Sequence, residues 1–185
     1  MTVGEASLFF ALLTLACWAT IATTCCLAVA MRVGFSSFAT VAFATISEIG
    51  LWLASLVAAV ATAGSLYYSL VAHFPPCELC WYQRICMYPL APVLFVAAIR
   101  RDRSVWVYVV PLASFGAVIS AYHAQLQAFP RERTFCSQIS PCTIRYVWEV
   151  GFVSLPHMAL AAFGFVIVMT LVARHDRAPH LQPGR

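Results

Sequence analysis

The chain has 185 residues, of which 62% are hydrophobic and only 10% are charged, whereas an average soluble domain has about 25% charged residues. This composition excludes an ordinary soluble protein. The net charge of +4 is spread along the chain and gives no sign of nucleic-acid binding. Segments in lipid must satisfy their backbone groups internally, which favours helices. We therefore expect an all-α integral membrane protein.

Five apolar segments follow one another along the chain, separated by charged residues or prolines. A membrane-spanning helix needs about 20 apolar residues. Four segments supply this length, and the third reaches it when residues 81–84 are added to its start. In chain order the segments are Ala6–Met31, Ile49–Phe74, Ile85–Ile99, Ser104–Tyr122 and Gly151–Ala173.

The arginines indicate how these helices are oriented. Arginines concentrate after the first, third and fifth segments, and the positive-inside rule makes that side cytoplasmic. The N-terminus and the loop 123–150 then lie outside, and the tail 174–185 is expected to be cytoplasmic and disordered. The cytoplasmic arginines are Arg32, Arg100, Arg101, Arg103, Arg174 and Arg177, and the outer ones are Arg84, Arg131, Arg133 and Arg145.

The first segment could instead be a signal peptide, because Ala28-Val29-Ala30 resembles a cleavage site. A signal peptide has a basic start and an apolar run of about 7–15 residues, and this segment has neither. Its cleavage would also place the C-x-x-C motif of Cys77 and Cys80 on the cytoplasmic side. We expect a retained membrane-spanning helix.

The eight cysteines fall into two groups. Those inside the apolar segments are interpreted as small packing residues. The others form two close pairs on the outer side, where disulfides are permitted. The packing group is Cys17, Cys25, Cys26 and Cys86, and the two outer pairs are Cys77 with Cys80 and Cys136 with Cys142.

Two close cysteine pairs are compatible with three kinds of site. Four thiolates can hold zinc, but the wide second spacing and an oxidising compartment work against this interpretation. Static disulfides are a second possibility, although a C-x-x-C loop is too short to remove much chain entropy. Thiol–disulfide exchange is the third, and the surrounding residues favour it.

Pro75 and Pro76 cannot continue the preceding helix. Cys77 and Cys80 therefore precede or open the third helix, where the helix dipole stabilises a thiolate. Arg84 follows Cys80 by one helical turn and shares its face. Its charge could lower a thiol pKa or bind an anionic electron acceptor. Alternatively, Arg84 is an interface residue whose charged end reaches the membrane surface.

The stretch Pro76–Arg84, PCELCWYQR, resembles the signature of DsbB-type disulfide bond formation proteins, which are membrane thiol:quinone oxidoreductases. The second cysteine pair and the entry to the last helix, Gly151–Pro156, extend the resemblance over about residues 46–173. The short spacing of Cys136 and Cys142 is closer to the BdbC-like branch of the family.

The resemblance implies a four-helix bundle core over residues 46–173. Residues 1–45 would then supply an extra N-terminal transmembrane helix and a cytoplasmic linker. It also implies a bacterial inner-membrane location. The partners would be a soluble DsbA-like thioredoxin-fold protein and a membrane quinone, either ubiquinone or menaquinone.

The resemblance also implies residue roles. Cys136 would form the mixed disulfide with the partner, and the reduced Cys136–Cys142 pair would then reduce Cys77–Cys80. Cys80 would face the quinone, and Arg84 would stabilise the thiolate and the quinone. His123 matches a quinone-site histidine, with a plain interface histidine as the alternative; His157 could also line the pocket.

Two other classes remain open from the sequence. Vitamin K epoxide reductase-like proteins also pair cysteines with quinone chemistry, but their active C-x-x-C lies in a late transmembrane helix, and the last segment here has no cysteine. A non-enzymatic, disulfide-stapled membrane scaffold would keep its cysteines oxidised. The loop 123–150 is long and rich in apolar residues, so we also expect it to contain a short helix on the membrane surface.

Overall fold

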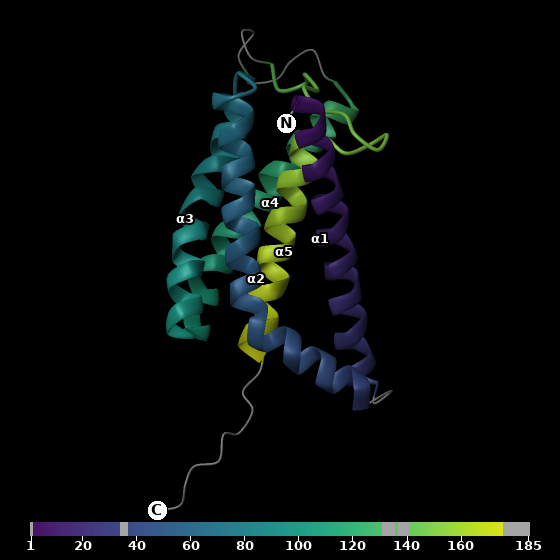
Figure 1. Ribbon diagram of the computed structural model, residues 1–185, viewed down its shortest axis with the longest axis vertical. Coiled ribbons are helices and arrows are strands. Elements are labelled where there is room, and N and C mark those ends of the chain that lie inside the picture. Colours follow the sequence, from purple (N-terminus) through teal and green to yellow (C-terminus); the bar gives the residue numbers. More distant parts are fainter. Residues whose placement is uncertain (1, 34–36, 131–135, 137–140, 176–185) are drawn as a thin grey trace, which may run out of the picture.

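The computed structural model describes residues 2–33, 37–130, 136 and 141–175. Five long helices and one short 3₁₀ helix account for most of them (Figure 1). The expected disordered tail falls mainly on residues 176–185, which lie outside the described residues, as do Arg131 and Arg133. The elements are α1 (Val3–Arg32), α2 (Ser37–Leu70), α3 (Glu78–Arg100), η1 (Arg103–Val105), α4 (Trp106–Ala128) and α5 (Leu155–His175).

All five long helices are long and apolar enough to cross a membrane. Among the described residues the only β-type pairing is an isolated bridge between Glu149 and Val153. The prediction of an all-α membrane protein with five spanning helices is therefore confirmed.

Helices α2 and α3 begin several residues before the apolar segments that predicted them. Helix α2 begins at Ser37 and continues through Glu48, because a charge marks the edge of an apolar run rather than the end of a helix. Its first turns run across the lower end of the bundle before the helix turns upward (Figure 1). Helix α3 begins at Glu78, so residues 81–84 do complete the short third segment.

The expected surface helix in the loop 123–150 is wrong for the described part of that loop. Residues up to Ala128 complete α4 instead. Residues 141–154 form turns and the bridge between Glu149 and Val153. The rest of that expectation falls on residues 131–135 and 137–140, outside the described residues.

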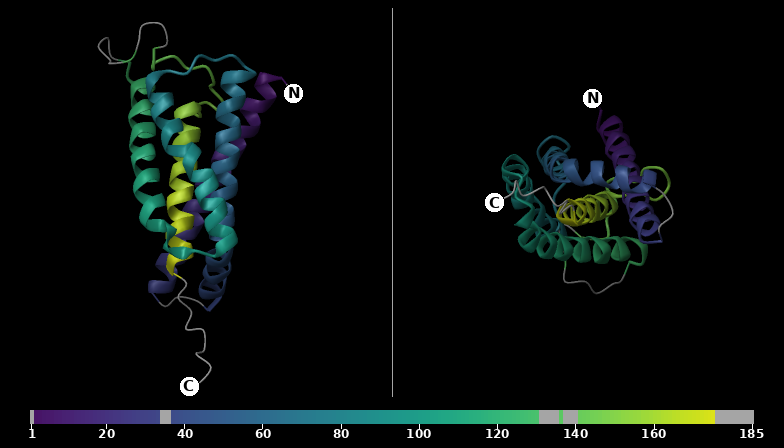
Figure 2. Two further views of the ribbon diagram at one scale, coloured as in Figure 1. Left: turned by 90° about the vertical axis from the view of Figure 1, so that its left-hand side faces the viewer. Right: turned by 90° about the horizontal axis from the view of Figure 1, so that it is seen from below.

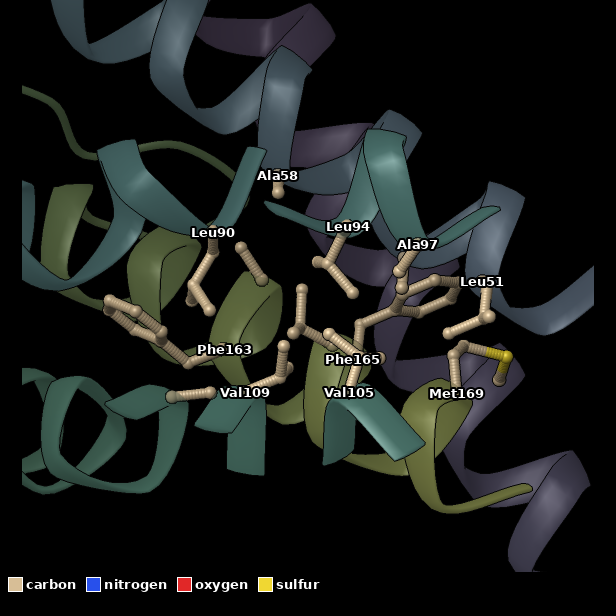
Figure 3. Packing of buried hydrophobic residues seen from close by; sticks show 14 of the residues in the cluster. Leu51, Ala58, Leu90, Leu94, Ala97, Val105, Val109, Phe163, Phe165 and Met169 are labelled. Carbon is tan, nitrogen blue, oxygen red and sulfur yellow. The ribbon is translucent and has the colours of Figure 1, made fainter. Parts of the chain in front are cut away.

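Helix α5 lies at the centre of the bundle, with α1, α2, α3 and α4 around it (Figure 2). Its buried side chains meet those of the neighbouring helices in one apolar core (Figure 3). Gly116 on α4 permits close packing there, because a side chain at this position would collide with the Phe163 ring. The largest fully buried members of this core are Leu90, Leu94, Val109, Phe163, Val166 and Met169.

The connections at the two ends of the bundle differ. The N-terminus, the α2–α3 connection and the long α4–α5 connection gather at one end, and α5 finishes at the other (Figures 1 and 2). We name the first the cysteine end, because it holds Cys77, Cys80, Cys136 and Cys142.

Candidate functional site

The C-x-x-C motif occupies the start of α3. Helix α2 ends at Leu70, and the two prolines lead an extended connection to Cys77. Cys77 is the N-cap of α3, and its sulfur accepts a hydrogen bond from the backbone N–H of Cys80 at 3.4 Å. This hydrogen bond and the positive end of the helix dipole favour the thiolate form of the Cys77 sulfur.

Cys77 and Cys80 are free thiols with their sulfur atoms 2.9 Å apart. The hydrogen bond from the Cys80 thiol, with a smaller contribution from His123, lowers the pKa of Cys77 to about 5 against the opposing effect of burial. In the reduced pair, Cys77 is thus the cysteine that favours the thiolate form.

His123 on α4 is almost completely buried between the two cysteine pairs. Its Nε2 lies 3.9 Å from the Cys77 sulfur and 3.1 Å from the carbonyl oxygen of Cys142. Its Nδ1 lies 3.4 Å from the side-chain amide nitrogen of Gln83. Because a carbonyl can only accept, the pattern fits a ring that donates from Nε2 to Cys142 and accepts at Nδ1 from Gln83.

Cys136 and Cys142 form a disulfide. Both are buried, and with Cys77, Leu79 and Leu126 they make one small apolar cluster. The pairing implied by the family resemblance is thus present, and the two cysteine pairs lie together. A Glu78 carboxylate oxygen lies within 4.8 Å of the Cys136 and Cys142 sulfurs.

This disulfide removes two of the four thiolates that a zinc site of four cysteines would need. The Cys77 and Cys80 sulfurs and a His123 ring nitrogen lie within 4.8 Å of one another. Two thiolates on one tetrahedral zinc would be about 3.8 Å apart, given Zn–S bonds of about 2.3 Å. The observed 2.9 Å suits a thiol–thiolate hydrogen bond better.

Arg84 is tied to α2. Its Nε donates to the Ser65 hydroxyl at 2.9 Å, and one terminal nitrogen donates to the Ser65 carbonyl oxygen at 3.0 Å. Tyr88 also contacts the Ser65 hydroxyl, at 3.3 Å. The guanidinium lies 5.2 Å from the centre of the Trp81 ring. The side chain is thereby directed between α2 and α3 in a fixed position.

A cavity of about 260 Å³ lies next to Cys80 and Arg84. Helices α1, α2, α3 and α5 line it, together with Pro75 and Pro76. Most lining side chains are apolar, and a few polar groups converge on one region, as in sites that bind small organic molecules. The polar lining residues include Ser65, Tyr68, Cys80, Gln83, Arg84 and Tyr88.

The two histidines singled out in the sequence are not among the residues that line this cavity. His123 lies between the cysteine pairs, as described, so its contact with a quinone stays a prediction. His157 hydrogen-bonds through Nδ1 with the Ser154 hydroxyl at 2.9 Å. That hydroxyl donates to the Gln127 side-chain oxygen at 2.7 Å, which ties the start of α5 to α4.

Sequence reasoning missed Ser65 and Gln83. Ser65 lies inside a long apolar run, and nothing local marks it as the partner of a residue 19 positions later. Gln83 belongs to the quoted motif, but its contact with His123 depends on how α3 and α4 pack.

Comparison with known proteins finds a family model that matches the chain from within α2 to α5. Residues 47–173 match the family model described as "Disulfide bond formation protein DsbB". A "Probable disulfide formation protein" of Coxiella burnetii (strain CbuK_Q154) is 39% identical over 141 residues, which are 73% of this chain and 96% of the relative. The "Disulfide bond formation protein C" of Bacillus subtilis (strain 168) is 39% identical over 130 residues, 69% of this chain and 94% of the relative. No solved structure matches the chain significantly.

Proposed function

The chain belongs to the DsbB family of disulfide bond formation proteins, and we propose that it is a thiol:quinone oxidoreductase. In this proposal it reoxidises a DsbA-like thioredoxin-fold protein outside the cytoplasmic membrane. The electrons pass to a membrane quinone, either ubiquinone or menaquinone.

The observation that supports this proposal most is the position of the C-x-x-C pair. Cys77 belongs to the buried cluster that holds the Cys136–Cys142 disulfide; Cys80 packs against this cluster and, unlike Cys77, also lines the apolar cavity. One cysteine of the pair thus faces a thiol-exchange partner, and the other faces a space suited to an apolar molecule. A carrier of electrons from protein thiols to a lipid-soluble acceptor needs both contacts.

The reaction balances as two exchanges and one oxidation. The partner's two thiols become a disulfide while Cys136–Cys142 opens to a dithiol, with Cys136 as the residue attacked. That dithiol then opens the Cys77–Cys80 disulfide and closes again. The new Cys77–Cys80 dithiol returns to a disulfide by losing two electrons and two protons.

The cavity residues fit a quinone as the acceptor. Apolar walls suit a ring with an isoprenoid tail, and Arg84 offers donors where negative charge develops. When bound, a quinone would take up the two electrons and two protons. Ser65 holds the guanidinium of Arg84 in place beforehand, so little reorganisation is needed.

The experiment uses the purified full chain, reduced with dithiothreitol and then freed of it. Mixing it with a short-tailed ubiquinone or menaquinone should give hydroquinone, followed by absorbance, and should restore the disulfides. Cys80→Ser should lose this reaction. Cys25→Ser, at an exposed position of α1, should retain it.

A non-enzymatic scaffold would behave differently in cells. Its outer cysteines would stay oxidised when quinone is depleted, whereas our proposal requires reduced thiols to accumulate. A mass-shifting alkylator reads this difference directly, and unchanged oxidation after quinone depletion would contradict the proposal.

A further inference from the structure

Helix α1 lies outside the part of the chain that matches the family, since the match begins at residue 47. It runs along the bundle beside α2 and α5 (Figures 1 and 2). Much of its surface is exposed, including the side chains of Leu8, Phe9 and Leu12. The remaining, covered face of α1 packs on α2 and α5.

The covered face of α1 lines the cavity next to Cys80 and Arg84. Four residues contribute: Phe10, Leu13, Thr14 and Cys17. Their spacing of three, four and seven positions places them in one stripe of the helix. Helix α1 is therefore one of the four helical walls of the cavity, and the only wall outside the family match.

This wall is held close by specific contacts at the same level of the bundle. Phe10 packs on Gly64 of α2 so closely that a Cβ atom at Gly64 would lie 3.0 Å from the Phe10 ring. The Tyr68 hydroxyl and the Ser7 hydroxyl are 3.2 Å apart. The Phe10 and Tyr68 rings lie 5.8 Å apart. Gly64 and Tyr68 themselves line the cavity, so these contacts attach α1 to α2 directly beside it.

We propose that α1 completes the quinone-binding site, and that Leu13, Thr14 and Cys17 contact the bound quinone and set its affinity. This inference rests on the proposed function, because it names further residues of the same site. In this proposal helix α1 takes no part in the electron transfer; it supplies mostly apolar contact area to the cavity wall. Family members without such a helix would have to close this side of the site with lipid or another protein.

Two neighbouring leucines give a matched test. Leu13 lines the cavity, whereas Leu12 points away and is 55% exposed. In the reduced full chain, Leu13→Trp should raise the concentration of a one-unit-tail ubiquinone or menaquinone that half-saturates its reduction by about tenfold or more, since small volume changes in apolar pockets have effects of this size. Leu12→Trp should leave it within about twofold of wild type. Reduction of the variants' disulfides by dithiothreitol should be unchanged.

A second measurement needs no variant and no turnover. Cys17 lines the cavity, while Cys25 and Cys26 on the same helix are exposed. The fully oxidised chain is treated with N-ethylmaleimide with and without the short-tailed quinone, and the peptides are quantified by mass spectrometry. Quinone should slow alkylation of Cys17 and leave Cys25 and Cys26 unaffected.

The outcomes separate the two proposals. If wild type reduces quinone but Leu13→Trp matches Leu12→Trp, α1 is no part of the site and this inference fails alone. Equal alkylation of Cys17 with and without quinone leads to the same conclusion, and it covers the case in which Leu13→Trp does not fold. If wild type neither binds nor reduces any quinone, the proposed function fails and this inference fails with it.

Discussion

At the scale of single residues, the dithiol is asymmetric, and His123 helps to make it so. The Cys80 thiol and His123 hold the pKa of Cys77 at about 5. A lowered thiol pKa stabilises the reduced pair, which makes the corresponding disulfide a stronger oxidant. This suits the proposed relay, in which the pair takes electrons from Cys136–Cys142.

The first prediction concerns the pH dependence of Cys77. Because its pKa is lowered, the thiolate should persist as pH falls from 8 and be lost only near about pH 5. Alkylation of Cys77 in the dithiothreitol-reduced chain should therefore follow a titration with a midpoint near that value. His123→Phe removes the ring nitrogens and should move the midpoint upward. An unmoved midpoint in this variant would show that His123 does not act on the thiolate.

The second prediction concerns Arg84. Arg84→Met keeps much of the side-chain length and removes the charge. We expect it to slow quinone reduction by about tenfold or more, equivalent to about 1.4 kcal/mol of barrier. Arg84→Lys keeps the charge but cannot keep both contacts to Ser65 in the same geometry, so partial activity should remain. The measurement is quinone absorbance after mixing with the reduced chain.

Thiol exchange between the two cysteine pairs should be nearly unaffected in both Arg84 variants. Arg32→Met, at the opposite end of the bundle, serves as a charge-matched control. If Arg84→Met shows wild-type quinone kinetics, Arg84 is only an anchor at the membrane interface.

At the scale of elements, the sequence predicted the features that nearby residues determine and missed the contacts between helices. The two prolines predicted that α3 starts near Cys77 and Cys80, because proline acts on the backbone within a few residues. The sequence could not predict that Ser65 of α2 holds Arg84, since that contact depends on how two helices pack. For the same reason it could not predict that α1 lines the cavity.

The third prediction concerns the α4–α5 connection, which carries the Cys136–Cys142 disulfide. Cys142→Ala removes the thiol that would release the partner, so a mixed disulfide between Cys136 and a thioredoxin-fold partner should accumulate. Non-reducing electrophoresis of cell membranes detects it as a band that disappears on reduction. Cys136→Ala should give no such band. A complex that needs Cys142 and survives the loss of Cys136 would reverse the two roles.

At the scale of the whole molecule, five spanning helices put the start of α1 and the end of α5 at opposite ends of the bundle. The structure places the N-terminus at the cysteine end and the end of α5 at the other (Figure 1). This arrangement was predictable from the apolar segments alone, because a chain that crosses the membrane an odd number of times starts and ends on opposite sides. The compartment on each side rests on the arginines, most of which follow α1, α3 and α5.

The last prediction tests that orientation. The cysteine end should face outward, because its disulfide needs an oxidising compartment and the arginine-rich ends should remain in the cytoplasm. A phosphatase reporter, active only outside, should be active when fused before Met1 and inactive after Arg185; a fluorescent reporter that matures only in the cytoplasm should give the reverse. Both fusions must retain quinone reduction, so that a misinserted chain is not scored. If both ends report the same side, α1 does not cross the membrane, and its place as a wall of the cavity would have to be abandoned as well.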